Sequence, residues 1–123
     1  MNITRRRWSR LVAMSAVLIV SVPYALAHSR PKVMVPAAYS TVASPAAISV
    51  TFTEALEAKF SSLNVTDEQG KKINTVSSKP APNDPLTLTL ALPPLQPGGN
   101  LVQWVSVAAD GHRMEGEYKF TVK

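Results

Sequence analysis

The chain has 123 residues, a formal net charge of +5 at pH 7 and no cysteine, so disulfide bonds and thiolate metal ligands are excluded. Four of the 13 lysine and arginine residues lie in the first ten positions, and residues 28–123 carry nine basic against eight acidic side chains. The positive charge therefore gives no indication of nucleic-acid binding, which requires a basic stripe with aromatic residues among it.

The first predicted element is a secretory signal peptide over residues 1–27. Four arginines precede an apolar run from Leu11 to Val22, and small residues occupy positions 25 and 27, which is the three-part arrangement of such signals. The apolar run is shorter than the roughly 20 residues of a membrane-spanning helix. We expect cleavage after Ala27, which makes His28 the first residue of a single domain, residues 28–123; an uncleaved anchor is the alternative.

The remainder of the chain alternates apolar with polar residues in short segments, as half-buried β-strands do. Ile48, Val50 and Phe52 alternate with serine and threonine, and Leu63 and Val65 precede a turn at residues 67–70. Residues 86–92 and 118–122 alternate in the same way. The segment 101–109 is a longer strand, and one of its two faces is formed by Val102, Trp104, Ser106 and Ala108.

Proline, glycine and asparagine separate these segments. We predict a loop over Lys79–Pro85, which contains three prolines, and a single helical turn over Ala55–Phe60. Several short strands at this spacing, without a sustained helical period, favour an all-β fold of two packed sheets.

His28 is the first residue with metal-binding potential. Cleavage before it would release a backbone amine with a pKa of about 8. This amine and the imidazole Nδ1 can close a six-membered ring around a metal ion, and two donors on one residue require little additional ordering. The alternative is that a histidine occupies the first mature position by chance.

The second candidate is the sequence Asp110-Gly111-His112, ahead of the last strand. Residues two apart in an extended segment project to the same side, and the intervening glycine allows the carboxylate and the imidazole to converge. Asp-Gly is also a favoured hairpin turn, and a turn with a solvated histidine is the alternative; a turn can equally present ligands.

Together these groups form a donor set of two imidazoles, one carboxylate and one amine. Such nitrogen-rich sets suit Cu(II), which prefers tetragonal geometry, although Zn²⁺ can use the same ligands. Met34 and Met114 lie among apolar neighbours and are interpreted as core residues. Glu54, at the end of the Phe52 strand, is a candidate second-shell partner of the amine or of an imidazole, or else a solvated carboxylate.

These features resemble the CopC copper-resistance domain family over the whole of residues 28–123. The resemblance rests on the histidine directly after the signal and on several motifs, of which the last is the most specific. They are Pro36 with Ser44-Pro45, Ile48-x-Val50-x-Phe52-Thr53-Glu54, Leu63-x-Val65-Thr66-Asp67-x-x-Gly70, Leu92-Pro93-Pro94-Leu95-x-Pro97-Gly98, Val102-x-Trp104-x-Ser106 and Asp110-Gly111-His112-x-x-x-Gly116-x-Tyr118-x-Phe120.

The resemblance implies a seven-stranded Greek-key β-sandwich or barrel, cupredoxin-like or immunoglobulin-like. It also implies a metal site for one Cu(II), with ligands His28, Asp110 and His112 and with Glu54 in the second shell. Some relatives have a further Cu(I) site in a methionine-rich loop; residues Asn74–Pro85 contain no methionine or histidine, so that site is expected to be absent here.

On the same analogy we expect a periplasmic copper carrier or buffer in copper homeostasis or resistance. It would be a monomer, would not be an enzyme, and would pass copper to an inner-membrane partner of the CopD type. Two alternatives stay open: a metal-free β-sandwich module that contacts a partner protein, since fold alone does not establish function, and a copper oxidase with an amino-terminal histidine brace.

Overall fold

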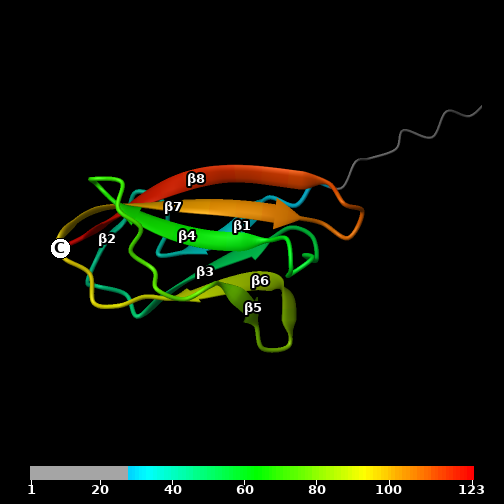
Figure 1. Ribbon diagram of the computed structural model, residues 1–123, viewed down its shortest axis with the longest axis horizontal. Helices are drawn as coiled ribbons and strands as arrows, with labels where there is room; N and C mark the ends of the chain where they lie inside the picture. The colour runs from blue at the N-terminus through cyan, green and yellow to red at the C-terminus, as the bar shows by residue number, and fades with distance from the viewer. Residues whose placement is uncertain (1–27) are drawn as a thin grey trace, which may run out of the picture.

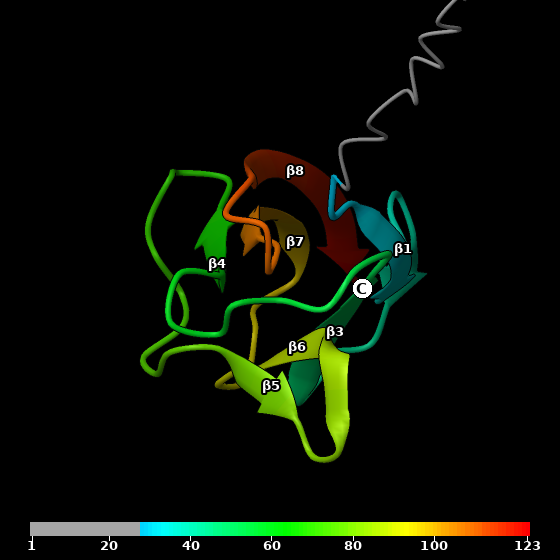
Figure 2. The same ribbon diagram turned by 90° about the vertical axis from the view of Figure 1, so that its right-hand side faces the viewer.

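The computed structural model describes residues 28–123, and the predicted signal peptide lies outside these residues. The described residues form two four-stranded sheets (Figures 1 and 2). Between residues 28 and 123 there is no helix of the length and apolarity that crossing a membrane requires. The strands are β1 (Pro31–Val35), β2 (Thr41–Val42), β3 (Ala47–Phe52), β4 (Ser62–Asp67), β5 (Lys79–Ala81), β6 (Asp84–Ala91), β7 (Gly98–Val107) and β8 (Arg113–Val122).

One sheet has the strand order β1-β3-β6-β5 and the other has the order β2-β8-β7-β4. The chain crosses between the sheets at every connection except the β5–β6 and β7–β8 hairpins. The predicted all-β sandwich is therefore confirmed. The described residues contain eight strands and not seven, and two of these, β2 and β5, have only two and three residues.

The core lies between the two sheets and is built from alternate residues of the central strands. In β3, Ile48, Val50 and Phe52 have no exposed area, as their alternation with polar residues predicts. Val102 of β7 and Phe120 of β8 supply the facing layer. Removal of this apolar surface from water, at about 25 cal/mol per Å², stabilises a domain that has no disulfide bond.

Two local predictions are wrong. The proline-rich segment Lys79–Pro85 is not a loop, because β5 and the first residues of β6 lie within it. Strand β5 lies at the edge of its sheet, where a proline is tolerated because one side of the strand needs no ladder hydrogen bonds. Residues Ala55–Phe60 contain no helix; Phe60 N–H donates to the Glu57 carbonyl at 3.1 Å in a simple turn.

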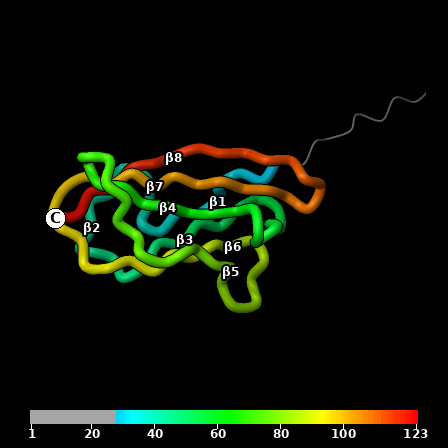
Figure 3. Tube along the Cα trace, in the orientation of Figure 1, coloured from blue at the N-terminus to red at the C-terminus, as the bar shows by residue number. Residues whose placement is uncertain are grey.

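Strands β7 and β8 form a long hairpin that runs the length of the molecule (Figure 3). Each strand has ten residues, which extend over about 33 Å. Residues 108–112 connect the two strands at one end of the molecule, and the first described residues lie at that same end. The carboxyl terminus lies at the other end. The hairpin thus brings the two predicted metal-binding segments together.

Candidate metal centre

The connection between β7 and β8 is a tight turn that fixes the backbone of the predicted ligands. Gly111 has a φ of +85° and donates its N–H to the Ala108 carbonyl at 2.8 Å. Ala108 in turn donates to the His112 carbonyl at 3.1 Å. Glycine is suited to position 111 because this positive φ is strained for other residues. The turn interpretation and the ligand interpretation of this segment are therefore compatible.

Asp110 and His112 face each other across this turn. Asp110 Oδ1 accepts the backbone N–H of His112 at 3.0 Å, and Oδ2 lies 2.9 Å from His112 Nδ1. Although the His112 side chain is 43% exposed, its Nδ1 atom is shielded from solvent and makes no hydrogen bond within residues 28–123. The contact of Nδ1 with Oδ2 lies within ion-pair distance. This contact and the backbone hydrogen bond together hold the carboxylate beside the imidazole.

The surroundings of Asp110 favour its charged form. The backbone N–H of His112 lowers the pKa of the carboxyl most, and the imidazole of His112 acts in the same direction. Positive charge on His28 also lowers the pKa of Asp110, which places His28 within electrostatic range. The site thus offers an ionised carboxylate, which is the form that binds a metal ion.

His28 reaches this turn from the other end of the domain sequence. Its ring centroid lies 5.7 Å from that of His112, with an angle of 60° between the ring planes, although the two residues are 84 positions apart. The His28 carbonyl accepts the Thr53 hydroxyl at 3.2 Å. While Ala27 remains attached, the His28 nitrogen belongs to a peptide bond and cannot act as an amine ligand.

The three predicted ligands are neighbours but do not form a ready-made metal cluster. Among residues 28–123, no three imidazole, thiol or carboxylate side chains are grouped closely enough to hold one metal ion. The carboxylate of Glu54 makes no hydrogen bond or ion pair with another described residue; the Glu54 backbone carbonyl instead accepts the Ser29 hydroxyl at 3.2 Å. The second-shell role of Glu54 stays a prediction.

Sequence reasoning missed the residues that fix the start of the domain. Ser29 and Ser106 are both fully buried, and the Ser106 hydroxyl donates to the Ser29 carbonyl at 2.6 Å. One signal was available: Ser106 is a polar residue on the inward row that Val102 and Ala108 also occupy. A buried polar side chain in such a row needs a hydrogen-bond partner.

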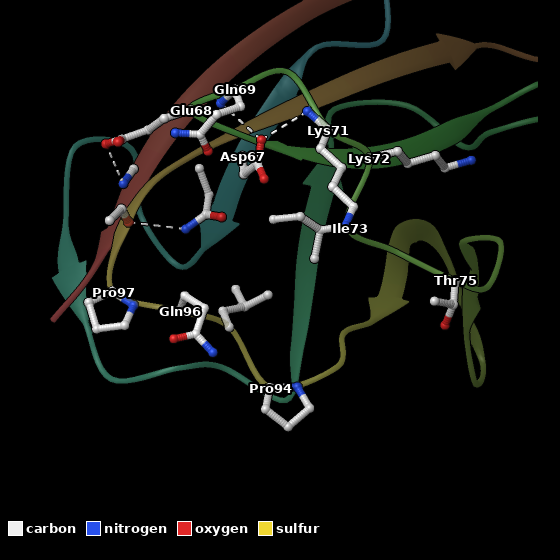
Figure 4. Close-up of a pocket in the computed structure, with 14 residues that line it drawn as sticks. Asp67, Glu68, Gln69, Lys71, Lys72, Ile73, Thr75, Pro94, Gln96 and Pro97 are labelled. Carbon is white, nitrogen blue, oxygen red and sulfur yellow. Dashed lines mark hydrogen bonds between the residues drawn. The ribbon is translucent and has the colours of Figure 1, made fainter.

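A pocket of about 520 Å³ lies at the opposite end of the β7–β8 hairpin, between the loop after β4 and the start of β7 (Figure 4). It contains no imidazole. The Glu68 carboxylate on its rim accepts the Gly99 N–H at 2.8 Å, and Asp67 accepts two backbone N–H groups. These contacts stabilise loops, and the pocket offers no imidazole ligand for a metal ion.

The family model for the CopC domain matches residues 32–123 of the chain. The match begins after His28, so it covers Asp110 and His112 but not the predicted amino-terminal ligand. Protein YobA from Escherichia coli strain K12 is 36% identical over 103 residues, which are 82% of this chain and 83% of YobA. Copper resistance protein C from Escherichia coli is 38% identical over 115 residues, which are 86% of this chain and 90% of that protein.

Solved structures show the same fold. The crystal structure of CopC from Methylosinus trichosporium OB3b matches with a TM-score of 0.73 and 35% identity, over 78% of this chain and 94% of that chain. PcoC, a methionine-rich copper resistance protein from Escherichia coli, matches with a TM-score of 0.65 and 36% identity, over 79% of this chain and 100% of that chain. The similarity therefore extends over the whole sandwich.

Proposed function

The chain belongs to the CopC domain family, and from this premise we propose that it is a periplasmic Cu(II)-binding protein that carries or buffers copper. Its function is related to copper, and as a member of this family it is not an enzyme. The proposal adds that residues 1–27 are removed on export and that one Cu(II) binds to His28, Asp110 and His112.

One observation carries this proposal: two histidines 84 positions apart in the sequence lie with their rings 5.7 Å apart, beside an aspartate with a lowered pKa. These two are the only histidines of the chain. Their meeting beside the Asp110 carboxylate brings all the imidazole nitrogens of the protein to one place. Imidazole, carboxylate and amine together are the donor types that Cu(II) binds well.

The chain's own residues would act as follows. Asp110 contributes negative charge and holds the His112 backbone, and His112 offers an imidazole nitrogen. After cleavage, His28 offers its amine and ring, with its carbonyl held by Thr53. Copper is the cargo, and protons compete with it for these nitrogens, so binding should weaken as the pH falls and should release protons.

The proposed partner is an inner-membrane protein of the CopD type, to which the monomer would deliver its copper. The site lies at one end of the sandwich, where the His112 side chain is 43% exposed and the Asp110 side chain 37% exposed. This exposure suits transfer, because a partner's ligands can approach Asp110 and His112 from solvent without unfolding the domain.

The decisive experiment compares two forms of the processed protein, both verified by mass spectrometry. One begins at His28, and the other has one additional residue before it. Cu(II) chloride is titrated into each in competition with a chelating dye. The additional residue converts the amine to an amide, so we expect at least a 100-fold loss of affinity, about 2.7 kcal/mol, with no change in melting temperature of the metal-free protein.

Equal affinity of the two forms would refute the amino-terminal chelate. Absence of retained Cu(II) in the form that begins at His28 would refute the copper-binding function itself and would favour the metal-free interaction module. Mass spectrometry of protein recovered from the cell envelope tests cleavage directly, since a first residue other than His28 is incompatible with the proposal.

A further inference from the structure

The segment immediately after His28 is attached to both sheets of the sandwich. Thr53, next to the end of β3, donates its N–H to the Arg30 carbonyl at 2.9 Å, and its hydroxyl accepts the Arg30 N–H at 3.1 Å. The same hydroxyl donates to the His28 carbonyl at 3.2 Å. Ser106 of β7 binds the residue between them, Ser29. Chain termini usually fray unless they are tied down, and this one is tied at three successive residues.

The contact between Ser29 and Ser106 is the buried part of this attachment. Neither residue has exposed area. The Ser29 carbonyl accepts the Ser106 hydroxyl at 2.6 Å, and the Ser29 hydroxyl donates to the Glu54 carbonyl at 3.2 Å. Without Ser106, the Ser29 carbonyl would lose this partner in a place that water does not reach, which is unfavourable for the docked segment.

Ser106 also lies on the strand that leads into the turn with Asp110 and His112. A single side chain therefore joins the segment carrying one proposed ligand to the strand that leads into the turn with the other two. Thr53 supplements this link from the other sheet. The hydrogen bond between Ser106 and Ser29 thus helps to keep His28 close to His112, although neither histidine takes part in it.

We propose that Ser106, assisted by Thr53, is a positioning residue that holds the mature amino terminus in place for copper capture. This inference rests on the proposed function, because it assumes that His28 supplies ligands. Neither hydroxyl is proposed to touch the metal. Their effect is on the fraction of molecules in which residues 28–30 are docked before copper arrives.

The size of the effect follows from that docked fraction. Apparent affinity falls in proportion to the fraction of molecules in the competent state. Leaving a buried carbonyl without its donor shifts a local equilibrium by roughly 5- to 150-fold. In the wild-type protein the docked fraction is already close to one, so the first part of this shift lowers it very little. We therefore expect Ser106→Ala to weaken Cu(II) affinity about tenfold.

Ser61 provides a matched control, because it directly precedes β4 and its side chain is hydrogen-bonded to β7, the strand of Ser106. It is 6% exposed, and its hydroxyl accepts the Val107 N–H at 3.0 Å and donates to the Val107 carbonyl at 3.4 Å. Ser61→Ala therefore removes a buried serine hydroxyl that is bonded to the neighbour of Ser106 but not to the amino terminus. We expect a comparable fall in melting temperature from both variants and a change of Cu(II) affinity within about twofold for Ser61→Ala.

Thr53 provides a conservative pair in an exposed position. Thr53→Val removes the hydroxyl at nearly constant shape, whereas Thr53→Ser keeps it. We expect about a threefold loss of Cu(II) affinity for the valine variant and recovery for the serine variant, as expected for a solvent-exposed hydrogen bond. Both variants leave the core unchanged, so folding is preserved.

Hydrogen exchange in the metal-free, processed proteins measures how firmly residues 28–30 are docked when no copper is present. The amides of Arg30 and Thr53 should exchange about tenfold faster in Ser106→Ala than in Ser61→Ala. Nitrogen hyperfine structure in the Cu(II) electron paramagnetic resonance spectrum should change in Ser106→Ala only. Wild-type affinity, spectrum and exchange in Ser106→Ala would overturn the positioning role while leaving the copper site intact, whereas a wild-type protein that binds no Cu(II) would overturn the proposed function.

Discussion

The two ends of the sheet formed by β2, β8, β7 and β4 carry similar turns that use their carboxylates differently. At one end, Asp67 Oδ1 accepts the N–H groups of Gln69 and Lys71 at 2.9 and 2.8 Å, and Gly70 has a φ of +78°. At the other end, Asp110 Oδ1 accepts one N–H, and its second oxygen faces an imidazole. A carboxylate in a turn stabilises the turn in both cases, but of these two only Asp110 has an imidazole nitrogen opposite it.

Proximity to histidine, not the turn itself, therefore distinguishes the proposed metal centre from an ordinary loop. The sequences Asp67 to Gly70 and Asp110-Gly111 would be read alike as turns. The difference arises because the segment of residues 28–30 lies at the second turn and brings His28 close to His112. The comparison predicts that substitutions at the Asp110 end will lower copper affinity, whereas substitutions at the Asp67 end will lower stability.

The largest expected effect is that of His112→Ala, which removes one of the two imidazoles of the proposed site. We expect at least a 100-fold loss of Cu(II) affinity, about 2.7 kcal/mol, measured by competition with a chelating dye. The backbone contacts of residue 112 with Asp110 and Ala108 do not depend on the side chain, so the melting temperature should change little. Retention of wild-type affinity would exclude this residue as a ligand.

The next effect is on stability alone and concerns the middle of the sheet. A Cβ atom at Gly116 would lie 2.6 Å from Cζ2 of Trp104, whose ring packs edge-on against Phe52 at 5.8 Å between centroids. Gly116→Ala forces this ring to move and should destabilise the fold by about 1–3 kcal/mol. Urea unfolding followed by Trp104 fluorescence measures the change; an unchanged midpoint would show that the ring has room to shift.

The paired variants Asp110→Ala and Asp67→Ala test the comparison directly. Asp110→Ala should lower Cu(II) affinity about tenfold, with a small change in stability, because its carboxylate is partly exposed. Asp67→Ala removes two hydrogen bonds to backbone N–H groups and should reduce stability by about 1 kcal/mol without affecting copper. The reverse pattern would mean that the ends of the sandwich have been assigned wrongly.

The smallest effect at neutral pH concerns Tyr118, where burial raises the pKa to about 12. Its hydroxyl makes no hydrogen bond with any residue of the described part, so Tyr118→Phe should leave stability at pH 7 nearly unchanged. The folded state holds the phenolic proton more tightly than the unfolded state, so stability is present below about pH 10 and lost towards pH 12. Wild type should lose at most about 2 kcal/mol there, after allowance for partial solvation, and the phenylalanine variant should lose less.

Much of this fold follows from alternation in the sequence. The buried rows of β3 and β7 were predictable because every second residue in these strands is apolar or small. The turn at Asp110 was predictable because Asp-Gly is a favoured turn sequence. Strand β5 was missed because prolines break strands in the interior of sheets but not at edges. Which segments become edges is decided by the packing of the whole chain.

The sequence indicated the candidate metal-binding residues but not the residues that hold them together. His28 and His112 drew attention as the only histidines of the chain. The contact of Ser106 with Ser29 joins residues 77 positions apart, and no local pattern encodes a pairing over that distance. Serine is common in both exposed and buried positions, so its role here became visible only from the fold.

The separation of His28 and His112 along the chain has a consequence for the resistance of the protein to proteases. A copper ion held by both would close a loop of nearly the entire domain, and such a closure reduces the entropy of the unfolded chain. Bound copper would therefore stabilise the folded sandwich, so that copper-loaded molecules should resist proteases longer than metal-free ones.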